Sequence, residues 1–258
     1  MDKKLAKALN LFKKKEYSKA IDAFSQLLEK ETDNAELYNN LALCYSYTGE
    51  VENAERFYLK ALNINPKLPQ VYINLADIYF KQKDFTNAIS LLQKATTEMP
   101  ENFVLAHYLA RVYMEDAMLD LAIYELDKVL EAQPENYDAY YDLARVYFEL
   151  GNYDLAIENF ENVLEFKEDN EWIFYYLAQA YEANGEVDKA ISNYLKAINV
   201  NEGFHPAYKK LGILFMARND FEDAVEYFEE YLKFDLPAEE KKNIKDSVDR
   251  IKRVKGEQ

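Results

Sequence analysis

Glycine and proline are scarce in this sequence, whose 258 residues include only six of each. A chain with many tight turns or β-hairpins needs more of both, because glycine supplies positive φ angles and proline fixes turn positions. Hydrophobic residues nevertheless make up 49% of the chain and aromatic residues 15%, which is enough apolar material for a packed core. The composition therefore predicts a folded, mostly helical protein.

Cysteine and histidine are almost absent. Cys44 is the one cysteine, so an internal disulfide framework is excluded and a reducing compartment fits. His107 and His205 are 98 residues apart and distant in sequence from Cys44, a spacing that suggests neither a zinc site nor a Cys–His nucleophile. No glycine-rich phosphate loop occurs either. We therefore expect no cofactor, no bound metal and no enzymatic activity.

Long apolar runs and an excess of basic charge are also lacking. No stretch approaches 18 consecutive apolar residues, and the lysine-rich segment 1–20 has no signal-peptide core, so we expect a cytoplasmic protein without membrane insertion. Acidic residues outnumber basic ones by 47 to 31, for a net charge of −16. Because nucleic-acid binding needs clustered lysine and arginine, we expect a protein or peptide partner and no nucleic acid.

The sequence does contain copies of itself. The string LARVY occupies residues 109–113 and recurs 34 residues later, at 143–147, and the segments 40–66, 74–100 and 108–134 align without a gap. A fixed period of this length is typical of repeat proteins. The register extends to seven repeats followed by a tail at 239–258: 1–34, 35–68, 69–102, 103–136, 137–170, 171–204 and 205–238.

Small and large residues recur at fixed positions of the repeat. The eighth position is alanine in six repeats and Gly212 in the last, and the twentieth is alanine in all seven. Large residues such as Tyr113 and Phe160 fill the eleventh and twenty-fourth positions. These positions form two helical stripes separated by turn residues such as Gly49 and Gly151. Each repeat is therefore predicted to be two antiparallel helices, and such short helices need neighbouring repeats for stability.

The thirty-second position holds Pro66, Pro100 and Pro134 in three repeats, where proline ends the helix pair. Glu168, Glu202 and Leu236 take this position in the three later repeats, so we expect their second helices to run slightly further. The tail 239–258 has Ile244, Val248 and Ile251 at helical spacing, followed by Gly256. It is predicted to be an amphipathic helix that caps the last repeat.

This pattern of small residues at 8 and 20, an aromatic at 11, a large apolar residue at 24 and proline at 32 resembles the tetratricopeptide repeat, over residues 1–238. The expected fold is all-α, a right-handed superhelical solenoid of antiparallel helix pairs. The resemblance further implies that a partner binds in a concave groove formed by the first helix of each repeat.

Positions 2, 5, 6, 9, 12 and 13 of the repeat share a face away from the packing stripe. This face is rich in aromatic, amide and arginine side chains, a composition suited to peptide recognition. The candidate partner-binding residues on it are Asn39, Asn40, Tyr47, Asn74, Asp77, His107, Tyr108, Arg111, Tyr141, Asp142, Arg145, Trp172, Tyr175, Tyr176, Gln179 and Lys209.

Two alternatives for this face stay open. Its aromatic rings either contact a partner or pack between repeats, and Arg111 and Arg145 either bind a partner or pair internally with nearby carboxylates such as Asp77 and Asp142.

Asn40 and Asn74 both hold the sixth position and resemble the start of an asparagine ladder, in which amides hold a peptide backbone.

Two hypotheses about function follow. The first is a non-enzymatic adaptor or scaffold that binds a peptide segment or helix of a partner in the groove. The second is a structural subunit that self-associates, or docks into a larger assembly through its convex face or ends. The fourth and fifth repeats carry 7 and 9 acidic residues against 2 basic residues each. This excess favours a partner with basic segments and salt-dependent association, or serves solubility alone.

Overall fold

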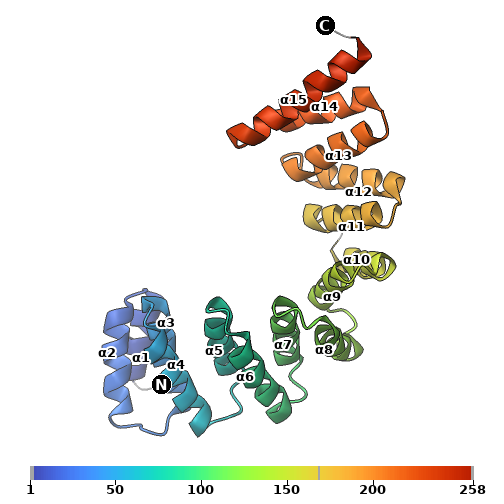
Figure 1. Cartoon of the computed structure of the whole chain (residues 1–258). Coiled ribbons are helices and arrows are strands. Elements are labelled where there is room, and N and C mark those ends of the chain that lie inside the picture. The colour runs from blue at the N-terminus through green and yellow to red at the C-terminus, as the bar shows by residue number, and fades with distance from the viewer. Residues whose placement is uncertain (1–2, 168, 257–258) are drawn as a thin grey trace. The chain divides into compact units, whose positions relative to one another are not determined.

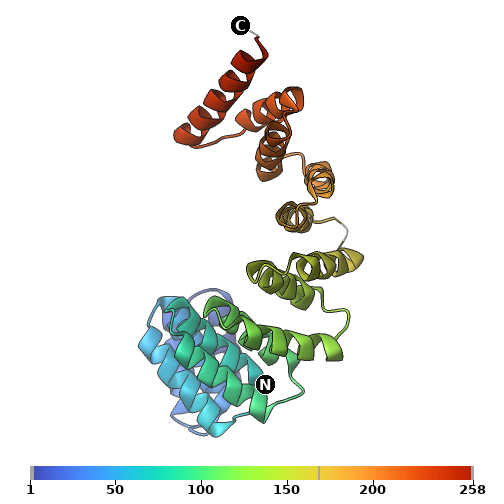
Figure 2. The same ribbon diagram turned by 45° about the vertical axis from the view of Figure 1, so that its right-hand side comes forward.

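The computed structural model describes residues 3–167 and 169–256, and over these residues the chain forms fifteen α-helices and no β-strand. The helices fall into two compact units, Met1–Pro134 and Glu135–Gln258, which we call the N-terminal and C-terminal units. The sequence pattern did not predict this division. In each unit, consecutive helices pack as antiparallel neighbours (Figures 1 and 2).

The N-terminal unit contains α1 (Lys3–Lys13), α2 (Tyr17–Leu28), α3 (Ala35–Thr48), α4 (Val51–Ile64), α5 (Pro69–Lys81), α6 (Phe85–Glu98), α7 (Phe103–Glu115) and α8 (Leu119–Ala132). The C-terminal unit contains α9 (Tyr137–Glu149), α10 (Tyr153–Phe166), α11 (Glu171–Ala183), α12 (Val187–Val200), α13 (His205–Ala217), α14 (Phe221–Leu232) and α15 (Ala238–Lys255). None of the described helices combines the length and apolarity needed to cross a lipid bilayer.

Asparagine holds the last position of four repeats, and there it begins the first helix of the next one. The Asn34 side chain accepts a hydrogen bond from the Leu37 backbone N–H at 3.1 Å, and Asn136 caps α9 in the same way through Ala139. Such a cap satisfies a backbone donor that has no partner within the helix. These caps fix where four of the six helices with candidate residues begin; α5 and α13 begin after Leu68 and Phe204, which form no side-chain cap.

The turn inside every repeat has the same backbone geometry, although its residue differs. Gly49, Gly151 and Gly185 have φ near 80°, and the equivalent Lys15, Lys83, Ala117 and Asn219 also have positive φ, between 55° and 63°. In the fourth repeat the N–H of Met118 bonds to the carbonyl of Tyr113 at 2.8 Å. This is the Schellman geometry that ends a helix with a left-handed residue. Ala117 therefore takes a conformation that glycine would adopt with less strain.

The expectation of longer second helices was wrong in the last three repeats. Helix α10 ends at Phe166, which is equivalent to Val200 at the end of α12, and α14 ends at Leu232, two positions earlier in its repeat. Helix α12 ends at Val200, the position equivalent to Ile64 at the end of α4, where proline follows. Asn201 explains the ending, because its backbone is extended and its side chain accepts from the Gly203 N–H at 2.9 Å. This local turn competes with a further helical turn whether or not proline follows. Glu168 lies outside the described residues.

The core of each helix pair lies where alanines meet large residues. The alanines at position 20 are fully buried, and so are Phe24, Tyr58 and Leu92 at position 24, each at most 1% exposed. In the last repeat, Gly212 stands opposite Phe228, and a Cβ on it would lie 2.5 Å from the ring. Beyond this pair, α15 buries Ile244, Val248 and Ile251 against α14.

Candidate partner-binding face

The first helix of each repeat carries the candidate residues. In the N-terminal unit they lie on α3 (Asn39, Asn40, Tyr47), α5 (Asn74, Asp77) and α7 (His107, Tyr108, Arg111). In the C-terminal unit they lie on α9 (Tyr141, Asp142, Arg145), α11 (Trp172, Tyr175, Tyr176, Gln179) and α13 (Lys209). We call the surface that these helices share in each unit the first-helix face.

The asparagines of α3 and α5 are turned partly inward. Asn74 accepts a hydrogen bond from the Gln70 side chain at 2.9 Å, and its own amide nitrogen is buried. The side-chain oxygen of Asn39 is buried as well. Asn40 remains half-buried. In this conformation the amide nitrogen of Asn74 faces the interior, so holding a peptide backbone in the manner of an asparagine ladder would require Asn74 to rotate.

A small hollow of about 70 Å³ lies between α5 and α7, lined by Asp77, Phe80, Tyr108 and Arg111 among others. The Arg111 guanidinium lies 5.9 Å from the centroid of the Tyr108 ring. Desolvation raises the pKa of the Asp77 carboxyl, although this side chain reaches solvent, and the positive charges of Lys81 and Arg111 offset part of the rise. The hollow thus combines one aromatic wall with a pair of opposite charges.

A larger hollow of about 230 Å³ lies at the equivalent place in the C-terminal unit, between α9 and α11. Its lining residues are Arg145, Phe148, Glu149, Phe160, Tyr176 and Gln179. Phenylalanine at position 12 and tyrosine at position 6 recur in both hollows, as Phe80 with Tyr108 and as Phe148 with Tyr176. The same repeat positions therefore produce a hollow in each unit, with different charges at position 9.

Arg145 has an internal partner. Its guanidinium lies 3.5 Å from a carboxylate oxygen of Asp142 and 5.9 Å from the centroid of the Tyr141 ring. Asp142 is only 6% exposed, so this candidate contact lies inside the repeat and not on the open surface. A buried carboxylate is unfavourable without a compensating charge. Arg145 therefore has a structural role, whatever else it contacts.

The aromatic residues of α11 form one cluster. Tyr176 stacks on Phe160 with ring centroids 6.2 Å apart and on Trp172 at 5.9 Å, and Tyr141 meets it edge-on at 5.9 Å. Burial raises the pKa of Tyr141 to about 12, so its hydroxyl stays neutral. Trp172 packs on Phe204 yet keeps 47% of its surface exposed. These rings thus pack between helices and also present an apolar surface.

The remaining candidates are distributed along the face. Tyr47 is 61% exposed and stacks on Tyr17 at 4.9 Å. His107 and Tyr108 are half-buried on α7, and Tyr175 packs on Tyr194. Lys209 forms an ion pair with Glu240 of α15 at 2.6 Å, which ties it to the C-terminal helix.

The sequence pattern assigned Phe160 to the core at position 24, and the structure shows that it also lines the hollow between α9 and α11. Glu149, at position 13 of the same face, lines the hollow too but was not among the candidates. The signal that could have identified Glu149 was its place on the same helical stripe as Arg145.

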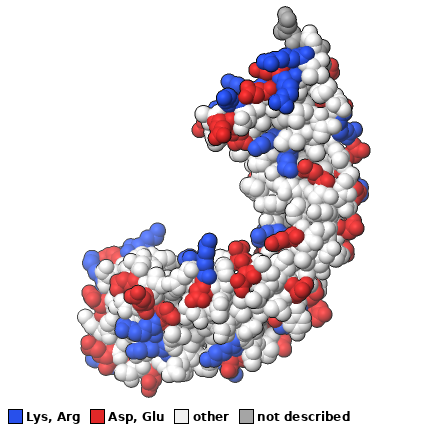
Figure 3. Space-filling view, in the orientation of Figure 1, with Lys and Arg blue, Asp and Glu red and all other residues white. Residues whose placement is uncertain are grey.

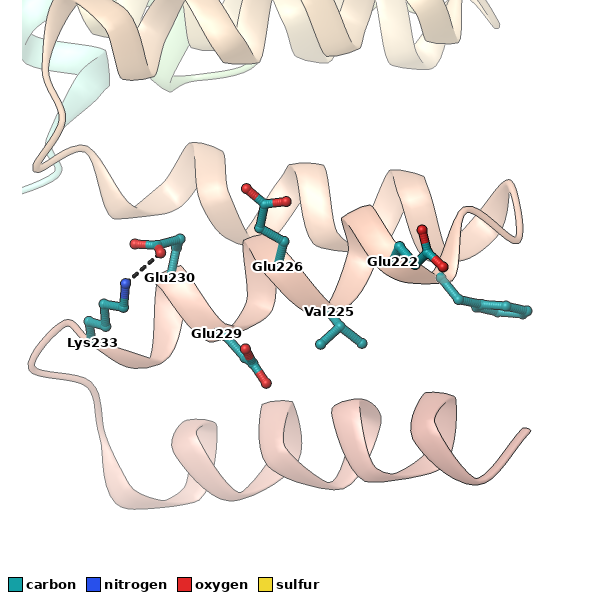
Figure 4. Close-up of a pocket in the computed structure, with 7 residues that line it drawn as sticks. Glu222, Val225, Glu226, Glu229, Glu230 and Lys233 are labelled. Carbon is teal, nitrogen blue, oxygen red and sulfur yellow. Dashed lines mark hydrogen bonds and ion pairs between the residues drawn. The ribbon is translucent and has the colours of Figure 1, made fainter. Parts of the chain in front are cut away.

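A separate hollow of about 400 Å³ runs along α14 (Figure 4). Glu222, Glu226, Glu229 and Glu230 line it, with Val225 among the others. Glu230 pairs with Lys233, and Glu229 pairs with Lys252 of α15 at 2.8 Å. Helix α14 and the residue that follows it supply the whole lining, and the charges are partly neutralised, so we interpret the hollow as a surface furrow.

Charged residues are spread over the surface seen in Figure 3, where basic side chains gather over the C-terminal helix. In the part of the chain that the structure describes, no group of three or more histidine, cysteine, aspartate or glutamate side chains is placed to hold a metal ion. Cys44 is buried, and burial raises the pKa of its thiol to about 12. That shift makes a reactive thiolate unfavourable at this position.

Family models of tetratricopeptide repeats match most of the chain. The models described as "TPR repeat" and "Tetratricopeptide repeat" match residues 144–185, 116–158, 173–204 and 207–239. A model of the "Tetratricopeptide repeat protein 21 ARM repeat" matches residues 2–118. None of the curated proteins matches the sequence.

Solved structures of repeat proteins are similar as well. The C-terminal part of a TPR repeat-containing protein from Cytophaga hutchinsonii has a TM-score of 0.77 at 20% identity, covering 93% of this chain and 98% of its own. A tetratricopeptide repeat protein from Parabacteroides merdae has a TM-score of 0.67 at 20% identity, covering 94% and 96%. MamA has a TM-score of 0.59 at 28% identity, covering 62% of this chain and 93% of its own.

Proposed function

We infer that this chain, which belongs to the tetratricopeptide repeat family, is a non-enzymatic scaffold that binds a segment of a partner protein on the first-helix face. The observation that carries this proposal is the hollow between α9 and α11, which is walled by aromatic rings and lies beside the half-exposed Trp172. Large, rigid aromatic side chains of this kind dominate the binding energy of many protein interfaces.

The distribution of charge supports the choice of a protein partner. The fourth and fifth repeats are strongly acidic, which opposes association with a phosphate backbone and favours partner segments that carry lysine or arginine. Association should then slow as the ionic strength rises, because salt screens the attraction between exposed charges.

Affinity capture from the native source, with the full chain as bait, tests the proposal. Trp172→Ala removes a 47% exposed ring from the first-helix face, and Tyr124→Ala removes a 61% exposed ring from the second helix of the fourth repeat. We expect Trp172→Ala to lose partners that wild type retains, while the variant stays folded at the temperature of capture, and Tyr124→Ala to keep them. Retention of every partner by Trp172→Ala would contradict binding on this face.

The alternative of self-association or docking through second helices also has an observation in its favour. Met118, Leu121 and Tyr124 lie in or just before α8 and are 42%, 46% and 61% exposed. Sedimentation velocity over a range of protein concentrations tests it. A concentration-dependent dimer that Tyr124→Ala abolishes supports the alternative, and a monomer at all concentrations argues against self-association.

A further inference from the structure

The size of the hollow between α9 and α11 indicates what it can hold. Its volume of about 230 Å³ is below the roughly 300–1,000 Å³ of pockets that enclose small-molecule ligands. A space of this size suits one large side chain of a protein segment. The equivalent hollow between α5 and α7, at about 70 Å³, is too small for the same occupant.

The walls of this hollow are held rigidly. Tyr176 is stacked on Phe160 and on Trp172, and Tyr141 and Tyr175 meet it edge-on at 5.9 and 5.8 Å. Phe148 packs edge-on against Tyr153 at 5.5 Å. Walls that are already ordered lose little conformational entropy when a ligand side chain enters. The hollow is therefore preorganised for contact with an apolar group.

The charges around the hollow indicate both what enters it and what lies beside it. Arg145 lines the hollow, so its guanidinium opposes a lysine or arginine side chain inside. Its charge is also matched by the buried Asp142, which makes an acidic occupant less favourable. Glu149 also lines the hollow, and it is exposed to solvent. In an acidic repeat, this carboxylate favours a basic residue next to the occupant.

We propose that the hollow between α9 and α11 receives one large apolar side chain, such as leucine, methionine or phenylalanine, from a partner segment whose neighbouring lysine or arginine contacts Glu149. This inference rests on the proposed function and adds the chemical class of the partner sequence. It assigns Phe148, Phe160 and Tyr176 to the apolar contact and Glu149 to the choice of the flanking residue.

The test uses mixtures of nine-residue peptides that lack tryptophan and carry one fixed central residue. Trp172 is the only tryptophan and stacks on Tyr176, so its fluorescence in the full chain reports on the hollow. Mixtures with central leucine or phenylalanine should bind about tenfold more tightly than those with central glycine, because a large apolar side chain is buried. A lysine fixed beside the central residue should tighten binding further at low salt.

Three variants separate the contacts. Gln179→Phe partly fills the hollow, and the fold should tolerate it because Leu9, Leu43 and Ile213 hold the same repeat position; we expect about tenfold weaker binding of the leucine mixture. Ser192→Phe, on the exposed side of α12, is the matched control and should leave binding unchanged. Glu149→Gln should remove the preference for the flanking lysine while the preference for leucine remains.

Several results would overturn the inference. The first is that mixtures with central glutamate, lysine or glycine bind most tightly. The second is that the leucine mixture binds equally to Gln179→Phe and to wild type. The third is that Glu149→Gln still prefers a lysine beside the central residue. The proposed function can hold when the inference fails, since capture that depends on Trp172 but not on Gln179→Phe places the partner on the face and outside the hollow. Capture that ignores both substitutions refutes the proposed function itself.

Discussion

Gly212 is the one glycine among the small residues at position 8, and replacing it by alanine should destabilise the last repeat. Alanine is favoured over glycine in a helix by about 1 kcal/mol. Against this gain, an ideal Cβ on Gly212 would lie 2.5 and 2.6 Å from two atoms of the Phe228 ring. Phe228 is 1% exposed and packs in the same cluster as Tyr231 and Ile244, so the ring has little room to move. Overpacking of this kind costs about 1–3 kcal/mol, and we expect a net loss of about 1 kcal/mol.

The measurement is urea unfolding of the full chain, with hydrogen exchange of α13 and α14 as a local readout, because repeat arrays can depart from two-state behaviour. A double variant supplies the control. Alanine opposite leucine is the native pair in two repeats, Ala76 with Leu92 and Ala110 with Leu126. In a Phe228→Leu background, Gly212→Ala should therefore be stabilising. A stabilising effect of Gly212→Ala in the wild-type background would refute the argument from the steric clash.

Three further predictions concern stability. Ala117→Gly should stabilise the protein by up to about 1 kcal/mol in urea unfolding, because it relieves a φ of 55°, and Gly151→Ala should have the opposite sign; equal signs would contradict this. Asn193→Leu should raise stability by about 1 kcal/mol, because the buried side-chain oxygen of Asn193 has no hydrogen-bond partner among the described residues; a loss of stability would show that the oxygen is satisfied. Desolvation raises the pKa of Asp77, so its ionised form opposes folding at neutral pH, and this effect disappears as the pH falls below the unfolded-state pKa of about 4. Asp77→Asn should therefore stabilise the protein at pH 7 more than at pH 4, and urea midpoints that shift equally at both pH values would contradict the assignment.

The helices could be predicted from the sequence because the packing of each repeat depends on a few positions with strict size requirements. Alanine at position 20 is fully buried in every repeat, and a larger residue there would separate the two helices. The end of α12 could not be predicted from position 32, because the helix is ended by a local turn at Asn201 and not by the residue after Asn201. The positive φ of Ala117 and Lys83 could not be predicted from the sequence either. The surrounding helices impose this turn on residues that do not favour a positive φ.

The sequence predicted which face of the helices carries the candidate site, but not where that face is hollowed. Helical spacing placed Arg145, Tyr176 and Gln179 on one side of the first helices, and the structure brings these three around one hollow. The same spacing placed Asp142 there too, although it is 6% exposed. Spacing gives the direction in which a side chain leaves the helix, whereas its exposure depends on how closely the next helix approaches. The hollow likewise depends on ring packing that no single repeat encodes.

Position 9 of the repeat varies among leucine, aspartate, arginine, glutamine and isoleucine, so the fold does not require any one of them. Arg145 is nevertheless constrained, because the buried Asp142 next to it would be left without this charge if the arginine were replaced. Loss of binding in an Arg145 variant would therefore mix an effect on the partner with an effect on folding. Glu149 and Gln179 line the same hollow, and among the described residues neither is the ion-pair partner of a buried charge. Substituting either residue therefore leaves no buried charge unpaired. The specificity of this face is for that reason best measured at Glu149 and Gln179, although LARVY is the most conspicuous repeated string in the sequence.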